Sequence, residues 1–127
     1  MDAPRILIVE DELITARALA LMITNMGYQV VGTEASGPGA IATAKETLPD
    51  LVLMDITLEG PMDGIEAAAE ILATHDTAIV YLTAYTQGPK FERAMASENY
   101  GCVSKPVSPH KLKQTIEAAV LKKKTDR

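Results

Sequence analysis

The chain has 127 residues, of which 47% are hydrophobic and 23% charged, and its formal net charge is −5 at pH 7. This length and composition predict one compact globular domain and exclude a multidomain enzyme within this chain. The negative charge argues against direct nucleic-acid binding, and one cysteine with two histidines supports neither a disulfide nor a zinc site. Because no apolar segment could span a bilayer or serve as a signal peptide, we expect a cytoplasmic protein without a membrane partner.

Five short apolar runs alternate with longer segments along the chain. Each run has the length and composition of a strand that is buried on both faces of a parallel sheet. The predicted strands are residues 6–9, 29–33, 51–54, 78–82 and 102–104. Their regular alternation with helical segments predicts a parallel sheet that is covered by helices on both faces.

The longer segments carry the signals of helices. Leu19, Met22, Ile23 and Met26 repeat with the spacing of one helix face, and Gly27 follows as a C-terminal cap. The next three predicted helices are residues 36–48, 63–74 and 89–98.

The fifth predicted helix begins near residue 108 and closes with three lysines, 122–124, which indicate a solvated end. No repeat or linker interrupts the alternation. We therefore predict a single domain over residues 1–127, with a core at about 5–121 and a basic C-terminal tail at 122–127. Its fold class is α/β, with a doubly wound five-stranded parallel sheet of the (βα)5 type. In such sheets ligands bind beyond the carboxyl ends of the strands.

Polar residues follow four of the five predicted strands, at the same edge of the sheet. They are Glu10 and Asp11, then Asp55, then Thr83 with Ala84, and finally Lys105 with Pro106. Taken singly, an acid after a strand is most simply a helix cap, and a threonine or lysine in a loop is solvated surface. Taken together, three carboxylates at one rim repel one another unless a cation joins them. This combination suits Mg²⁺ and a phosphoryl group, with the lysine opposite.

These motifs, together with Met62-Asp63-Gly64, resemble the receiver domain of two-component response regulators, and the resemblance covers nearly the whole chain. It implies a flavodoxin-like fold with strand order 2-1-3-4-5. It also implies that Asp55 is the phosphoacceptor, that Thr83 and Lys105 contact the phosphoryl group, and that the bond before Pro106 is cis. The implied ligands of Mg²⁺ are Glu10, Asp11, Asp55 and the backbone carbonyl of Thr57.

The resemblance further implies a signalling module rather than an enzyme, either a response regulator or part of a hybrid kinase. Asp55 would take its phosphoryl group from a phosphohistidine on a sensor histidine kinase or a histidine phosphotransfer protein, and release it slowly to water. A downstream protein partner would bind the fourth helix, fifth strand and fifth helix. Two alternatives stay open: a binding module that works without phosphorylation, and an aspartate-nucleophile phosphatase. Thr57 counts against the second, because such phosphatases carry a second acid there.

One position departs from the family pattern. Three residues before the strand-end lysine, where the family usually carries a switch aromatic, this chain has Cys102. A thiol is too small to fill and empty the space of an aromatic ring. We therefore expect another aromatic to report phosphorylation: Tyr85, beside the small residue Ala84, or Tyr100, placed on the same strand face as Cys102. Tyr85 is the preferred choice because it adjoins the threonine hydroxyl.

Overall fold

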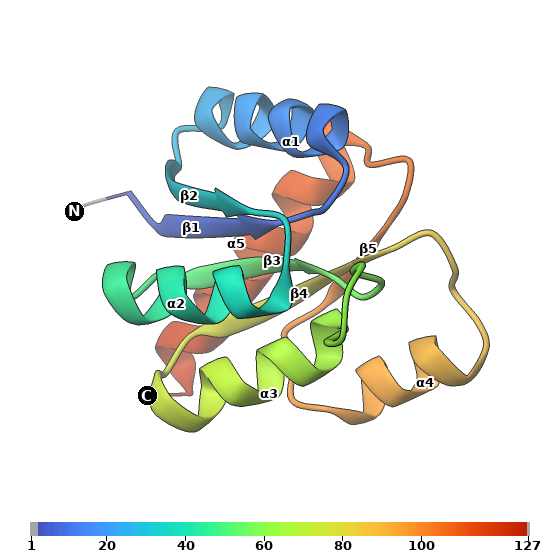
Figure 1. The fold of residues 1–127 in the computed structure, drawn as a ribbon. Helices are drawn as coiled ribbons and strands as arrows, with labels where there is room; N and C mark the ends of the chain where they lie inside the picture. Colours follow the sequence, from blue (N-terminus) through green and yellow to red (C-terminus); the bar gives the residue numbers. More distant parts are fainter. Residues whose placement is uncertain (1–2, 127) are drawn as a thin grey trace.

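Over residues 3–126, which the computed structural model describes, five strands alternate with five helices (Figure 1). The strands are β1 (Arg5–Val9), β2 (Gln29–Glu34), β3 (Leu51–Asp55), β4 (Ala78–Thr83) and β5 (Cys102–Ser104). The helices are α1 (Leu13–Asn25), α2 (Gly37–Thr47), α3 (Gly64–Thr74), α4 (Pro89–Ala96) and α5 (Pro109–Thr125). Residues 1, 2 and 127 of the predicted domain lie outside the described part. None of the helices in that part combines the length and apolarity of a membrane span.

The strands form one parallel sheet in the order β2-β1-β3-β4-β5, which confirms the predicted fold class and strand order. Because the sheet is parallel, the carboxyl ends of all the strands lie at one edge. The register places Val9 opposite Met54 and Asp55 opposite Leu82 at that edge. The residues that follow β1, β3, β4 and β5 are therefore neighbours in space.

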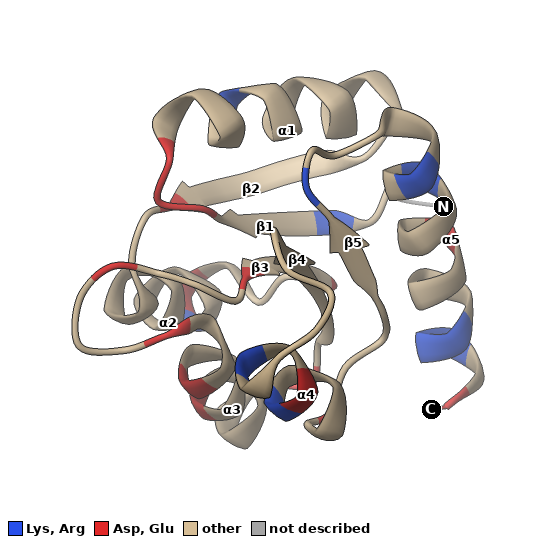
Figure 2. Ribbon diagram, turned by 90° about the vertical axis from the view of Figure 1, so that its right-hand side faces the viewer, with Lys and Arg blue, Asp and Glu red and all other residues tan. Residues whose placement is uncertain are grey.

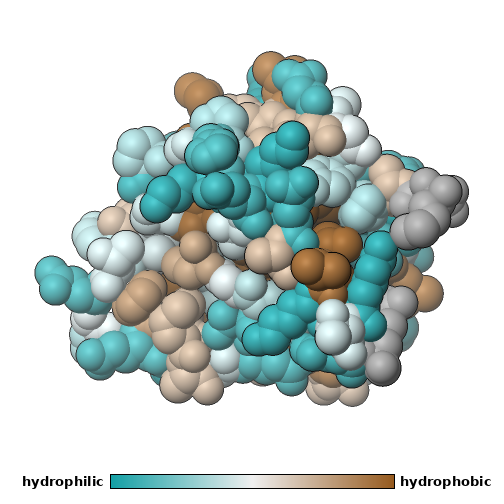
Figure 3. Space-filling view, turned by 180° about the vertical axis from the view of Figure 1, so that it is seen from behind, coloured by the Kyte–Doolittle hydropathy of each residue, from teal (hydrophilic) through white to brown (hydrophobic). Residues whose placement is uncertain are grey.

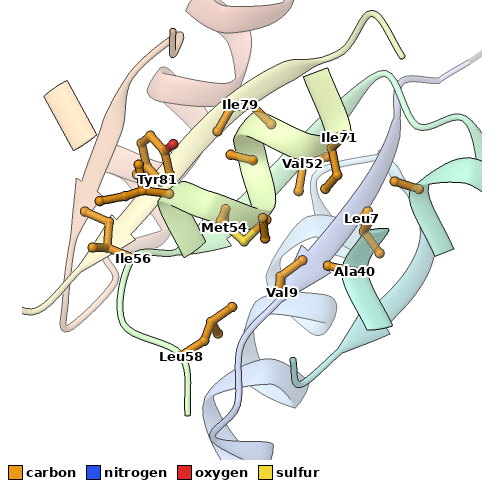
Figure 4. Close-up of a cluster of buried hydrophobic side chains, with 14 of the residues drawn as sticks. Leu7, Val9, Ala40, Val52, Met54, Ile56, Leu58, Ile71, Ile79 and Tyr81 are labelled. Carbon is orange, nitrogen blue, oxygen red and sulfur yellow. The ribbon is translucent and has the colours of Figure 1, made fainter. Parts of the chain in front are cut away.

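Two hydrophobic clusters, one on each face of the sheet, hold the helices in place. Alternate strand residues pack against α2, α3 and α4 on one face and against α1 and α5 on the other. Figure 4 shows the first cluster, in which Leu7, Val9 and Met54 of the strands meet Ala40 of α2 and Ile71 of α3. Every residue of β3 and β4 is buried, which explains why these runs are apolar without alternation.

Side-chain caps set several helix boundaries. Ser36 accepts a hydrogen bond from Gly39 N at the start of α2, and Asp63 forms a reciprocal capping box with Glu66 at the start of α3. These two caps were counted as helical in the predicted ranges, so each helix begins one residue later. Helix α4 ends two residues before its predicted end, because Ser97 turns its hydroxyl onto the carbonyl of Ala94 at 2.5 Å.

The end of α5 differs from the prediction of a solvated lysine run. The helix continues through Thr125, and Lys123 is only 9% exposed. Its ammonium forms an ion pair with Asp76, which follows α3. Lys123 lies four residues after the buried Ala119, so the helical period returns it to the inner face. The prediction that all three lysines are solvated was therefore wrong for Lys123.

Candidate functional site

Three carboxylates meet at the carboxyl edge of the sheet. Glu10 and Asp11 follow β1 and Asp55 ends the neighbouring strand β3, so the sheet brings them together. One oxygen of each lies within 4.8 Å of the others. Glu10 and Asp55 are buried, at 2% and 4% exposed, and Asp11 is half-buried. Figure 2 shows this acidic edge in red where β1 and β3 end. We call these three residues the carboxylate cluster.

Lys105 supplies a positive charge to the carboxylate cluster. Its Nζ lies 2.5 Å from Glu10 Oε1 and 2.8 Å from Asp55 Oδ2. The backbone N–H of Lys105 donates to the carbonyl of Thr83 at 2.7 Å, which fixes the segment after β5 against β4. The Lys105–Pro106 bond is cis, as the resemblance implied. One ammonium thus faces two buried carboxylates, and the third has no cation among the described ion pairs.

The pKa values of two groups of the site, Glu10 and Lys105, are both raised. Burial raises the pKa of Glu10 to about 7, although the hydrogen bonds from Lys105 and from Glu12 N oppose the rise. Burial alone would lower the pKa of Lys105, but its bonds to Asp55 and Glu10 outweigh this and raise it. Lys105 is therefore held as an ammonium, whereas the charge on Glu10 is costly.

The loop after β3 is fitted closely around Asp55. Thr57 N donates to Asp55 Oδ1 at 3.1 Å, and Glu59 N donates to Asp11 Oδ2 at 3.2 Å. A Cβ on Gly64 would lie 1.9 Å from the backbone oxygen of Asp55, so only glycine fits where α3 begins. No sequence signal identified Glu59, because its contact is made by the backbone. The proposed ligand role of the Thr57 carbonyl stays a prediction.

Thr83 is buried at the end of β4, but its hydroxyl is bonded away from the carboxylates. Oγ1 donates to the carbonyl of Tyr85 at 2.7 Å and accepts from Tyr85 N at 3.0 Å. Ala84 between them is exposed, and the side chain of Tyr85 is 71% exposed. The hydroxyl must therefore give up its bond to the Tyr85 carbonyl before it can donate to a group bound at Asp55.

The candidate switch residues lie on different sides of the sheet. Cys102 packs in the cluster with α3 and α4, whereas Tyr100 packs in the cluster with α1 and α5. The expectation that they share a face was wrong. Tyr100 precedes β5, and Gly101, with φ +145°, interrupts the alternation between them. The hydroxyl of Tyr100 donates to Asp126 at 3.1 Å, far along the chain from the site.

An apolar groove adjoins the site on its other side. It has a volume of about 460 Å³ and lies between α1 and the segment after β5. Its lining includes Ile14, Ala18 and Met22 of α1 together with Lys105 and Pro106. Ile14 is 81% exposed, and Figure 3 shows hydrophobic atoms at the top of the molecule, where α1 lies. We call this feature the α1 groove.

Comparison with known proteins gives consistent matches. The family model described as response regulator receiver domain matches residues 6–117. The transcriptional regulatory protein PdtaR of Mycobacterium tuberculosis is 40% identical over 116 residues, which are 91% of this chain and 56% of that protein. The chemotaxis protein CheY of Thermotoga maritima is 33% identical, over 88% of this chain and 93% of that protein.

Solved structures agree with the sequence matches. The signal receiver domain of a modulated diguanylate cyclase from Desulfovibrio desulfuricans G20 superimposes with a TM-score of 0.93 at 36% identity, covering 99% of this chain and 100% of that one. The anti-anti-sigma factor PhyR from Bartonella quintana gives 0.85 at 27% identity, covering 99% of this chain and 51% of that one. The chain spans about half the length of the first curated relatives that it matches.

Proposed function

Because the chain belongs to the response regulator receiver domain family, we propose that it is a phosphorylation switch with Asp55 as its phosphoacceptor. The observation that carries this proposal is the environment of the Asp55 carboxylate. It is buried, it belongs to the carboxylate cluster, and Lys105 Nζ lies 2.8 Å from its Oδ2. A carboxylate beside a fixed ammonium can act as a nucleophile toward phosphorus.

In the proposed reaction, an Asp55 carboxylate oxygen forms a bond to the phosphorus of a phosphohistidine. The phosphorus–nitrogen bond breaks, and the imidazole of the donor leaves with its electron pair. Lys105 pairs with the charge of the transferred group, and the hydroxyl of Thr83 donates to it after leaving Tyr85. Small, exposed Ala84 leaves room beside that hydroxyl. Water later attacks the phosphorus, the bond between phosphorus and the Asp55 oxygen breaks, and the carboxylate and inorganic phosphate are released.

We propose that Glu10, Asp11 and Asp55 hold Mg²⁺, with the Thr57 carbonyl as a further ligand. The observation behind this is that three clustered carboxylates face a single ammonium, and hard carboxylate oxygens are the donors that Mg²⁺ prefers. A bound Mg²⁺ neutralises the nucleophile and the phosphoryl oxygens.

We propose that the phosphodonor protein docks in the α1 groove. It is apolar and lies against Lys105, so a helix docked there brings its own side chains next to Asp55. This suits a sensor histidine kinase or a histidine phosphotransfer protein, because both must present a phosphohistidine. A downstream protein partner would use α4, β5 and α5. We place the protein in the cytoplasm, which suits its single, half-buried Cys102.

The test is incubation with acetyl phosphate and Mg²⁺, followed by intact mass. Wild type should gain one phosphoryl group, and Asp55→Asn should gain none. Glu46→Gln, an exposed acid on α2, is the control for a lost carboxylate and should be phosphorylated like wild type. An equal adduct on Asp55→Asn, or equal labelling in excess EDTA, would refute the assignment. Repeated turnover of a free phosphoester would instead identify a phosphatase.

A further inference from the structure

Helix α4 has the fewest buried residues of the five described helices. It has eight residues, of which Ala94 alone is buried. Among the described residues, two side-chain contacts join α4 and its cap Ser97 to segments distant in the chain. Arg93 Nη2 lies 2.7 Å from Asp63 Oδ2, and the hydroxyl oxygens of Ser97 and Tyr81 lie 3.4 Å apart. Figure 2 shows α4 beside α3, with charged residues of both signs on α4 and acidic residues on α3. We call these two contacts the α4 latch.

The first contact of the α4 latch leads to the phosphoacceptor. Asp63 caps α3, because its Oδ1 accepts a hydrogen bond from Glu66 N at 2.9 Å. Its Oδ2 accepts a hydrogen bond from Arg93 Nη2. Burial alone would raise the pKa of Asp63, but these partners lower it, so the carboxylate stays charged. The next residue, Gly64, is the one seated against the backbone of Asp55. Arg93 therefore joins α4 to the segment that positions Asp55.

The second contact leads to Thr83. Tyr81 is fully buried on β4, two residues before Thr83 and therefore on the same face of the strand. Cys102 on the neighbouring strand β5 pairs with Tyr81 in the sheet, and both side chains pack in the cluster with α3 and α4. Figure 4 shows Tyr81 next to Ile56, the residue after Asp55. Tyr81 is thus the buried aromatic nearest to the position where an aromatic at 102 would lie.

Space for movement exists at the same place. Tyr81, Ser97 and residues of α3 line a cavity of about 340 Å³ beside the end of α4. At the other end of the helix, Gly88 has φ +103° and joins α4 to the exposed loop after Thr83. A glycine in this conformation can act as a hinge. The cavity at one end of α4 and the glycine at the other leave room for the helix to shift once the α4 latch opens.

We propose that the α4 latch holds α4 in the arrangement in which Thr83 is bonded to Tyr85. Tyr81 is then the aromatic side chain that couples Thr83 to α4, because the thiol of Cys102 is too small for this role. When the Thr83 hydroxyl donates to a phosphoryl group on Asp55, it leaves the carbonyl of Tyr85 without its donor. The exposed loop then loses the bond that holds it to the end of β4, and its shift draws α4 away from its two contacts. The inference rests on the proposed function of Asp55.

The test measures binding of beryllium fluoride, an acyl-phosphate mimic, by amide chemical shifts in the presence of Mg²⁺. Because the α4 latch opposes the bound arrangement, Arg93→Gln and Tyr81→Phe should each bind about two- to fivefold more tightly than wild type. The matched controls are Lys90→Gln, an exposed cation of α4, and Tyr28→Phe, a tyrosine remote from α4. Both controls should bind like wild type.

Two further measurements separate a latch from a merely structural effect. The tightening by Arg93→Gln should shrink at high salt, because the ion pair is half-exposed and screened, whereas that by Tyr81→Phe should not. If Tyr81→Phe is unstable, Ser97→Ala removes the same contact from the other side, together with the bond from the Ser97 hydroxyl to the carbonyl of Ala94. If the affinity is unchanged in Arg93→Gln and also in Tyr81→Phe or Ser97→Ala, the latch is refuted but the proposed function of Asp55 stands. Binding that is absent in wild type, or that persists in Asp55→Asn, would overturn the proposed function and the latch with it.

Discussion

Replacing Glu10 with glutamine is expected to stabilise the protein without Mg²⁺ at about pH 8, although it removes an ion pair. Burial raises the pKa of Glu10 from its ordinary 4.5 to about 7. Between pH 4.5 and about 7, the Glu10 carboxyl binds its proton more tightly in the folded protein than in the unfolded chain. The free energy of unfolding therefore falls as the pH rises from about 4.5 to about 7, and below this window the penalty is absent.

The structure gives the size of the effect. The shift in the Glu10 pKa corresponds to about 3 kcal/mol above pH 7, and the side chain is fully buried, so solvent does not screen the penalty. Glutamine removes the charge and keeps an oxygen for the backbone N–H of Glu12. The hydrogen bond from Lys105 already counts in the Glu10 pKa, so the gain is offset in part by the amide nitrogen of glutamine, a donor that cannot accept from the Lys105 ammonium. We expect a net gain of about 1–2 kcal/mol at pH 8.

The assay is urea unfolding in EDTA, followed by circular dichroism because the chain has no tryptophan. The gain from Glu10→Gln should shrink to within about 0.5 kcal/mol near pH 5, whereas Glu46→Gln should change little at either pH. Saturating Mg²⁺ should stabilise wild type more than the variant by mass action. A gain that does not vary with pH, or a loss of stability at pH 8, would refute the argument from burial.

Three further changes test other parts of the structure. Gly64→Ala should cost about 3 kcal/mol or more in urea unfolding, because its Cβ would lie 1.9 Å from the oxygen of Asp55; wild-type stability would contradict the close approach. Asp11→Asn should gain about 1 kcal/mol in EDTA and weaken Mg²⁺ binding at least about tenfold by calorimetry; equal affinity would remove Asp11 from the ligand set. Ser36→Ala should lose about 1 kcal/mol, because Gly39 N loses its cap; an unchanged midpoint would show that water replaces the hydroxyl.

The sheet and the positions of the polar residues could be predicted from the sequence for a simple physical reason. A parallel sheet buries both faces of its central strands, so β3 and β4 read as unbroken apolar runs, and the first polar residue after each run marks the carboxyl edge. Asp55 and Thr83 are therefore visible in the sequence as the points where apolar runs end. Their meeting in space follows from the parallel connection alone.

Other features depend on contacts between distant segments and have no local signal. Nothing near Lys123 indicates that Asp76 would draw it into the fold, and nothing near Arg93 indicates its pairing with Asp63. The placement of Tyr100 failed for a local reason, because the alternation rule holds only within a strand and Gly101 lies outside β5. Hydroxyl orientation is likewise invisible in the sequence, as Thr83 shows.

The order in which the site residues occur in the chain has a consequence for biosynthesis. A ribosome delivers Glu10, Asp11 and Asp55 first, and the ammonium that faces them arrives only with Lys105, after the short edge strand β5. A nascent chain that has docked β1 and β3 but not β5 holds the carboxylates together without that partner charge. Repulsion among them then disfavours early closure of this edge, and the nucleophile lacks its ammonium until the last strand has joined. Competence for phosphorylation would thus mark a finished molecule, and partly made copies would not compete for the donor.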